Sequence, residues 1–510
     1  MTFDLGIRRS GIVLHLTSLP GPHGVGDLGA DARRFVDWLA DCGQSLWQVL
    51  PFHPVGPGHS PYQCPSAFAG CPWMVALPPL VRAGWLDAAA LDDVPAFDPL
   101  RADYERAIPW RWARLQRAAA GFFARARPAE RRRFEAWCEA ERGWLDEWTL
   151  YAALKDAHGG GPWWAWGEAL ARRDAAALRR AHARHAGQRR VHAFVQWQFD
   201  EQLQSLREHA RERGVALMGD VPIFVAHDSA DVWSRPDLYF MDERHALTVV
   251  AGVPPDGFGP DGQRWGNPLY RWDRMAAEGY GWWVARLERA LAQADLVRID
   301  HFRGFAGYWE VPAACPTARE GRWAPGPGAP LFEAFRAALG ESLPIVAEDL
   351  GTITPDVIAL RDGFGLPGMR IVQEGFGGWG DGSPAACAGH PFLPHHHVAH
   401  ALAYSSTHDS DTARGWWDAA PPATRAFAAE YLACDDAERI HWALIRATSQ
   451  SVARLALFPL QDVLGLDSAH RMNRPGTADG NWRWRFDWPM LGSDTATWLA
   501  RITTAAGRAR

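Results

Sequence analysis

Short apolar segments recur along the chain, and each ends at a polar or glycine-rich turn. They occupy residues 11–16, 45–50, 215–220, 294–300, 343–348, 369–373, 400–405 and 454–458. Between most of them, apolar residues follow the 3.6-residue period of an amphipathic helix, as in 30–42, 280–293, 331–339 and 355–364. Eight strands alternating with helices predict an α/β fold, a (β/α)8 TIM barrel with inserted, mostly helical subdomains.

The spacing of these segments is uneven. Residues 79–213 separate the second and third predicted strands and are mostly helical in pattern, and residues 222–279 separate the third and fourth. We interpret both as insertions into one catalytic barrel that spans 1–510. The second insertion contains a loop, 253–268, rich in glycine, proline and aromatic residues. We expect this loop to border the active site as a lid.

Composition narrows the choice of partners. The chain is 47% hydrophobic with a net charge of −6, which indicates a globular protein and argues against nucleic acid or an anionic membrane as a partner. We therefore interpret the arginine-rich segment 171–190 as a solvated helix face. No apolar run is long enough to span a membrane, and the N-terminus is a poor secretory signal.

Lysine and cysteine usage excludes some chemistry. Lys155 is the only lysine, so the chain has no P-loop, and a pyridoxal Schiff base would need this residue on a helix surface. The seven cysteines show no C-x-x-C spacing, which is typical of reduced thiols and predicts a cytoplasmic protein.

Carboxylates stand where four of the predicted strands end. Asp220, Asp300 and Glu348 close the third, fourth and fifth strands, and Asp409 follows the seventh. Strand ends of this kind face the active site of a barrel. Arg298 shares a strand face with Asp300 because strand side chains alternate. The sequence therefore predicts an acidic site with one arginine in it.

This pattern suits retaining glycoside chemistry. A cation at Arg298 favours an ionised Asp300, as a nucleophile requires. Glu348, if shielded from cations and crowded by other acids, would have a raised pKa and could hold a proton for a leaving group. Such carboxyl pairs lie about 5 Å apart.

Two other interpretations of the acids remain. A barrel-rim ion pair with acids spaced by chance is one, and a divalent-metal site in a carboxylate cluster is the other. The charge of Arg298 argues against the metal. The histidines in 395–400 lack further ligands at suitable spacing and are better interpreted as a loop.

Short motifs extend this interpretation over nearly the whole chain. They are T-S-L-P-G-P (17–22), S-P-Y-Q (60–63), G-D-V-P-I-F-V (219–225), V-A-G-V-P-P-D (250–256), G-Q-R-W-G-N-P-L-Y-R-W (262–272), V-R-I-D-H-F-R-G (297–304), A-E-D-L-G (347–351), T-H-D (407–409) and G-T-A-D-G-N-W (476–482). In this order they resemble amylomaltase, the 4-α-glucanotransferase or disproportionating family, glycoside hydrolase family 77, in the α-amylase clan.

The resemblance implies a role for each acid. Asp300 matches the nucleophile, Glu348 the acid/base and Asp409 a third acid that holds sugar hydroxyls. Further positions match substrate-binding residues, namely Arg298, His408, Tyr62, Asp220 and Trp265. The implied enzyme transfers α-1,4-glucan segments between maltooligosaccharides, with no metal and no organic cofactor.

Four positions depart from the family pattern. Glycine at 257 stands where tyrosine is typical, and glutamate at 374 where an aromatic residue is usual. Cys71 and Ser410 each replace an asparagine. We expect Gly257 and Glu374 to lie on the acceptor side, so the balance between transfer and hydrolysis stays open.

Three rival functions therefore remain. They are an α-amylase-type hydrolase with the same acids, a glucan phosphorylase, which the missing cofactor lysine disfavours, and a catalytically silent glucan-binding protein.

Overall fold

A barrel of eight parallel strands forms the centre of the computed structural model, which describes residues 3–255, 259–377 and 384–509. The strands are β1 (Arg9–Val13), β2 (Leu46–Gln48), β3 (Ala216–Val221), β6 (Leu296–Ile299), β9 (Ile345–Ala347), β10 (Gly368–Ile371), β11 (Ala401–Tyr404) and β12 (Leu455–Pro459). Their order is β10-β11-β12-β1-β2-β3-β6-β9, and all neighbours are parallel. Each strand overlaps one of the apolar segments, so the predicted (β/α)8 barrel is confirmed.

The two end strands of this order also meet. The backbone N–H of Ala347 in β9 donates to the carbonyl of Pro367, directly before β10, over 2.9 Å. Apolar side chains such as Met218, Leu296 and Val346 pack together as one buried cluster within the strands. The barrel is therefore a packed core, and its chemistry is confined to the strand ends.

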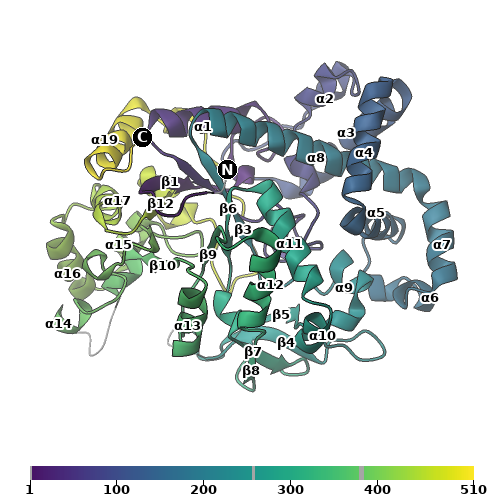
Figure 1. Ribbon diagram of the computed structural model, residues 1–510. Helices are drawn as coiled ribbons and strands as arrows, with labels where there is room; N and C mark the ends of the chain where they lie inside the picture. Colours follow the sequence, from purple (N-terminus) through teal and green to yellow (C-terminus); the bar gives the residue numbers. More distant parts are fainter. Residues whose placement is uncertain (1–2, 256–258, 378–383, 510) are drawn as a thin grey trace.

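Helices surround the barrel (Figure 1). The four predicted helices appear as α1 (Ala30–Asp41), α11 (Gly281–Gln293), α12 (Ala329–Leu339) and α13 (Pro355–Gly363). In α1 the buried residues Phe35, Val36 and Leu39 follow the helical period. Later helices are α14 (Pro384–Cys387), α15 (Ala413–Ala419), α16 (Pro422–Leu432), α17 (Ile440–Gln450), α18 (Leu460–Val463) and α19 (Ser493–Ala505).

The chain between β2 and β3 is helical and lies to the right in Figure 1. Its helices are α2 (Pro78–Arg82), α3 (Tyr104–Arg125), α4 (Pro128–Ala140), α5 (Arg142–Ala157), α6 (Glu168–Ala171), α7 (Ala175–Arg184) and α8 (Ala186–Glu212). The long helix α8 contacts α1, α3, α4 and α5, and so joins this region to the barrel. In α7, Arg179 and Arg180 are exposed.

A second sheet, antiparallel, lies beside the barrel at the bottom of Figure 1. It consists of β4 (Val249–Val253), β5 (Gln263–Pro268), β7 (Gly307–Pro312) and β8 (Arg322–Pro325), in the order β5-β4-β7-β8. The expectation of a loop over 253–268 is therefore wrong for 263–268, which is a strand. The predicted lid reduces to the connection 254–262, and Gly257 within it lies outside the described residues.

Two short helices, α9 (Ala230–Ser234) and α10 (Trp272–Ala277), complete the chain between β3 and β6. Among the helices in the described parts of the chain, none is long and apolar enough to cross a membrane.

Candidate active site

A cleft of about 650 Å³ opens where the barrel strands end. Its lining includes seven of the eight predicted site residues, Tyr62, Trp265, Arg298, Asp300, Glu348, His408 and Asp409. The eighth, Asp220, lies buried beneath the others and is 4% exposed. The structure thus brings together residues from positions 62 to 409 of the chain at one end of the barrel.

Arg298 connects two of the acids. Its Nη1 donates to both oxygens of Asp220, over 2.9 and 2.8 Å, and its Nη2 donates to Oδ1 of Asp300 over 2.7 Å. Asp220 and Arg298 are register partners on β3 and β6, which explains this contact. Burial raises the pKa of Asp220 to about 6, and the Arg298 guanidinium opposes that shift. Asp220 therefore anchors the guanidinium that Asp300 contacts.

The hydrogen bonds between neighbouring barrel strands extend to the backbones of Asp300 and Glu348. The backbone N–H of Asp300 donates to the carbonyl of Val221 over 3.0 Å, and that of Glu348 donates to the carbonyl of Ile299 over 3.1 Å. Because strand hydrogen bonds fix both backbones, the two carboxyl groups have rigid supports.

Glu348 occupies a site that favours its protonated form. Its Oε2 accepts from the backbone N–H of His301 over 2.6 Å, and its Oε1 from that of Leu350 over 2.8 Å. Burial and the charge of Asp300 nevertheless raise the pKa of Glu348 to about 8, against these two donors and Arg298. The balance of these contributions raises the pKa of Glu348 above its ordinary value, which favours the protonated form.

His301 aims one of these donors through its backbone conformation. Its φ of 53° is left-handed, which is uncommon for a residue other than glycine. This turn directs the backbone N–H of His301 at the carboxyl group of Glu348. A strained residue held between two acids is typical of a functional site.

Asp409 is held from the C-terminal part of the chain. Asn473 donates from Nδ2 to Oδ1 of Asp409 over 2.7 Å, and Arg471 donates to its backbone carbonyl over 2.8 Å. His408 Nε2 lies 3.4 Å from Oδ2. The carboxylate is half-buried, so its position is fixed while it stays open to the cleft.

Tyr62 connects the buried Asp220 with His408 in the lining of the cleft. Its hydroxyl donates to Oδ2 of Asp220 over 2.8 Å and lies 3.0 Å from Nε2 of His408. Its ring stacks on that of His408, with centroids 5.4 Å apart and planes 8° from parallel. Burial, with Asp220 next in effect, raises the pKa of Tyr62, so the phenol stays protonated.

Two tryptophans of the second sheet face the cleft. Trp265 lies on β5 rather than on the expected loop and meets His301 edge-on at 4.7 Å. Trp323 on β8 also lines the cleft and is 43% exposed. The centroid of its ring lies 3.8 Å from the guanidinium carbon of Arg303. Sequence reasoning missed Trp323 because the short segment that carries it has no strand-like alternation.

The buried carboxyl of Asp462 fixes the position of the segment that carries His408 and Asp409. Its Oδ2 accepts from the hydroxyls of Ser405 and Ser406 over 2.7 and 2.6 Å. Sequence reasoning missed it, because its partners lie far away along the chain.

The departures from the family pattern lie in different places. Glu374 and Ser410 line the cleft, whereas Cys71 is buried elsewhere. Glu374 is exposed to the cleft, and the protein around its carboxyl, together with the charge of Asp409, raises its pKa to about 7. Within the described ranges, no group of three or more His, Cys, Asp or Glu side chains is arranged to hold a metal ion.

Comparison with known proteins decides the family. A family model described as 4-alpha-glucanotransferase matches residues 14–490. The chain belongs to the 4-α-glucanotransferase family. A 4-alpha-glucanotransferase of Thermus thermophilus is 50% identical over 485 residues, 94% of each chain. One from Synechocystis sp. is 45% identical over 503 residues, 98% of each chain.

One solved structure agrees with this 4-α-glucanotransferase assignment, and a second shows the same fold. Amylomaltase from Streptococcus agalactiae, solved in complex with acarbose, superimposes with a TM-score of 0.94 at 33% identity, covering 99% of this chain and 100% of the other. Amylomaltase from Corynebacterium glutamicum shares the fold, with a TM-score of 0.76 at 19% identity, over 97% of this chain and 75% of that one.

Proposed function

We propose that this chain is a retaining 4-α-glucanotransferase, which moves a segment of an α-1,4-glucan to the 4-hydroxyl of another glucan or of glucose. The observation that carries the proposal is the contrast between Asp300, paired with a guanidinium, and Glu348, whose pKa is about 8. One carboxyl is equipped to attack and the other to donate a proton. The named relatives and the acarbose complex of the streptococcal enzyme support the substrate class.

In the first step Glu348 gives its proton to the glycosidic oxygen as the bond from that oxygen to the anomeric carbon breaks. Asp300 attacks the same carbon from the opposite face and forms a β-linked glycosyl-enzyme. Because Arg298 engages Oδ1 of Asp300, we assign the attack to Oδ2. The leaving glucan departs with a new 4-hydroxyl.

In the second step another glucan enters and its 4-hydroxyl attacks the anomeric carbon. Glu348, now ionised, takes the hydroxyl proton, and Asp300 leaves as a carboxylate. Two inversions restore the α-1,4 linkage. Asp409, held by Asn473, accepts hydrogen bonds from sugar hydroxyls and stabilises positive charge in both transition states.

The aromatic and histidine side chains position the sugars. Tyr62 and His408 present stacked rings to the sugar whose bond is broken, and Trp265 borders the acceptor. Transfer exceeds hydrolysis only when the acceptor binds well and water is excluded. We assign water exclusion to Trp265 together with Val253 and Pro254, which line the cleft with it.

Hydrolysis is the second candidate function, and one observation favours it. Glu374 brings an ionisable carboxyl to the cleft beside Asp409, where the family usually has an aromatic side chain. A carboxyl group retains water better than a ring does, so it lowers the barrier to hydrolysis of the glycosyl-enzyme relative to transfer.

A cytoplasmic location stays a prediction. The seven cysteines are all free thiols, which supports a reducing compartment.

Incubation with maltotriose in the absence of phosphate separates these functions. A 4-α-glucanotransferase gives glucose and a ladder of longer maltooligosaccharides with constant total reducing ends, and Asp300→Asn abolishes the ladder. A rise in reducing ends without longer products makes the chain a hydrolase. Product formation only with added phosphate makes it a phosphorylase, and no product at all points to a binding protein.

A further inference from the structure

A second cavity of about 600 Å³ lies between α5, α9 and α11, at the junction of the helical insertion and the barrel. Its lining includes Trp144, Trp148, Trp282, Asp231, Glu288 and Phe68. None of the residues that line it also lines the active-site cleft. In volume it nearly equals that cleft, so it is large enough for a ligand of similar size.

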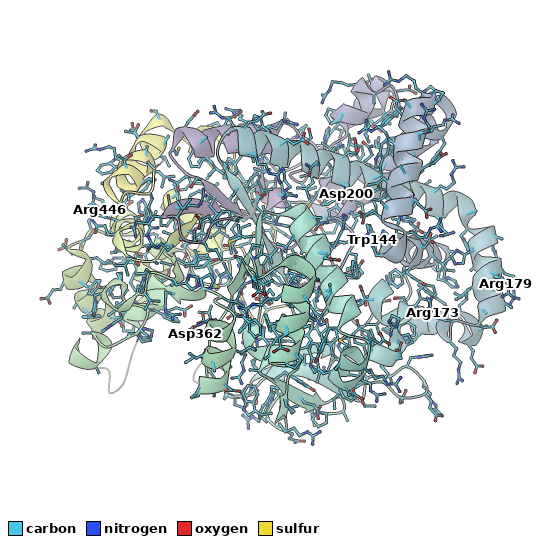
Figure 2. The ribbon with its side chains drawn as sticks, viewed as in Figure 1. Trp144, Arg173, Arg179, Asp200, Asp362 and Arg446 are labelled. Atoms are coloured by element: carbon cyan, nitrogen blue, oxygen red, sulfur yellow. The ribbon has the colours of Figure 1, made fainter. Side chains whose placement is uncertain are left out.

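Trp144 gives the cavity one fixed aromatic wall. Its indole Nε1 donates to Glu141 over 2.5 Å, and the guanidinium of Arg289 lies 4.8 Å from the ring centroid. Arg289 is itself held by two hydrogen bonds to Asp200, of 2.8 and 2.7 Å. Figure 2 labels Trp144 and Asp200 close together at the junction. The ring is half-buried and oriented without any ligand.

Trp282 gives a second aromatic wall. It is half-buried on α11 and meets the ring of Phe68 edge-on, with centroids 5.9 Å apart and planes at 84°. The polar edge and flat face of such rings suit the apolar faces of sugar rings. Because both tryptophans are packed in place, a sugar would lose little binding energy in ordering them.

A buried carboxyl lies beside these rings. Asp231 is 4% exposed and lines the cavity, and its Oδ2 accepts from the backbone N–H of Ala67 over 2.8 Å. Burial raises the pKa of Asp231 to about 6, while hydrogen bonds from Ala67 and from the Trp282 side chain oppose the shift. Such a carboxyl can accept from or donate to a sugar hydroxyl.

The charges in the cavity disfavour an anionic ligand. Arg289 is paired with Asp200, and Arg235 is paired with Glu278, over 2.6 Å. The cavity thus presents paired arginines together with the carboxyls of Asp231 and Glu288. A neutral polyhydroxyl ligand meets no repulsion there, whereas a phosphate would.

We propose that this cavity binds a second segment of α-1,4-glucan, with sugar rings against Trp144 and Trp282 and a hydroxyl on Asp231. The choice of glucan rests on the proposed function. We call the cavity the outer groove.

The outer groove is connected to the active site through the chain. Tyr62 and Gln63 line the cleft, and Ser66 and Phe68 of the same loop line the outer groove. Between them, Ala67 is tied to Asp231. A long glucan held in the outer groove stays on the enzyme between transfers, which raises its effective concentration at the cleft.

Binding of maltoheptaose to the inactive Asp300→Asn protein tests the proposal without turnover. Calorimetry should show two sites. Adding Trp144→Ala should remove one site or weaken it by about tenfold or more, whereas Trp144→Phe keeps an aromatic wall and should retain most of the affinity. Trp498→Ala is the matched control, because Trp498 is also half-buried with an arginine, Arg501, 5.2 Å from its ring.

Kinetics give the second readout. In the otherwise unaltered protein, Trp144→Ala should raise KM for amylose by about threefold or more, with kcat retained and a much smaller effect on maltotriose. Unchanged maltoheptaose stoichiometry and affinity in Trp144→Ala would overturn the outer groove, even if transfer from maltotriose is intact. Absence of transfer from maltotriose in the wild-type protein would instead overturn the proposed function.

Discussion

Arg298 donates from Nη2 to Oδ1 of Asp300 over 2.7 Å, while its Nη1 is fixed by both oxygens of the buried Asp220. A single guanidinium therefore serves an acid inside the barrel and an acid at its rim. Asp220 fixes the guanidinium of Arg298, and this guanidinium fixes the carboxyl group of Asp300. Asp300 therefore needs no rearrangement before it attacks.

Arg298→Lys should lower kcat on maltotriose by about 100-fold or more, because an ammonium group cannot make the forked contacts of a guanidinium. Initial rates of product formation measure the effect. The variant keeps a positive charge in the barrel, so its folding is checked by thermal unfolding. A kcat within about threefold of wild type would show that the positive charge alone supports catalysis, without the forked hydrogen bonds of the guanidinium.

The pH profile should report Glu348. The first step needs its protonated form, and its pKa is about 8, so kcat/KM should fall as pH rises through about 8. Glu348→Gln should lose about 100- to 10,000-fold in rate, and the residual activity should lack this alkaline limb. An alkaline limb that survives in Glu348→Gln would assign it to another group.

Stability should depend on the same group with a defined sign. The pKa of Glu348 rises from 4.5 to about 8 on folding, so between these values the folded protein holds a proton that the unfolded chain has lost. Wild-type stability therefore falls across this window as pH rises. Glu348→Gln cannot lose that proton, so its unfolding temperature relative to wild type should be higher at pH 9 than at pH 4. A constant difference would contradict the buried, protonated carboxyl.

Glu374→Phe should shift the balance from hydrolysis toward transfer. Its carboxyl lines the cleft near Asp409, and removing it takes away a group that retains water. The ratio of longer oligosaccharides to new reducing ends from maltotriose should rise several-fold. Glu374→Gln is the control that removes the charge but keeps the polarity, and it should give a smaller change. An equal ratio in all three proteins would remove Glu374 from the choice of acceptor.

The barrel could be predicted from the sequence because its parallel strands are buried on both faces and so read as short apolar runs. The acids could be predicted because each follows such a run, and alternation placed Arg298 and Asp300 on one face. The link between Arg298 and Asp220 could not be predicted in this way, because it depends on the register between β3 and β6.

The second sheet escaped prediction for a different reason. The strand β5 contains glycine and proline, and its partner β4 belongs to a sheet that continues in β7 and β8, after the barrel strand β6. Local patterns carry no signal for such pairing. The roles of Asn473 and Asp462 could not be predicted for the same reason. Asn473 contacts Asp409 and Asp462 contacts Ser405, and the partners in each pair lie far apart along the chain.

Capture of the glycosyl-enzyme tests the central proposal most directly. A maltosyl fluoride needs no proton for its leaving group, so Glu348→Gln should form the intermediate and discharge it slowly. Peptide mass mapping should place the sugar on Asp300, and added maltose should release it as a longer maltooligosaccharide faster than water does. A sugar on another residue, or no covalent species while the fluoride is consumed, would contradict a double displacement through Asp300.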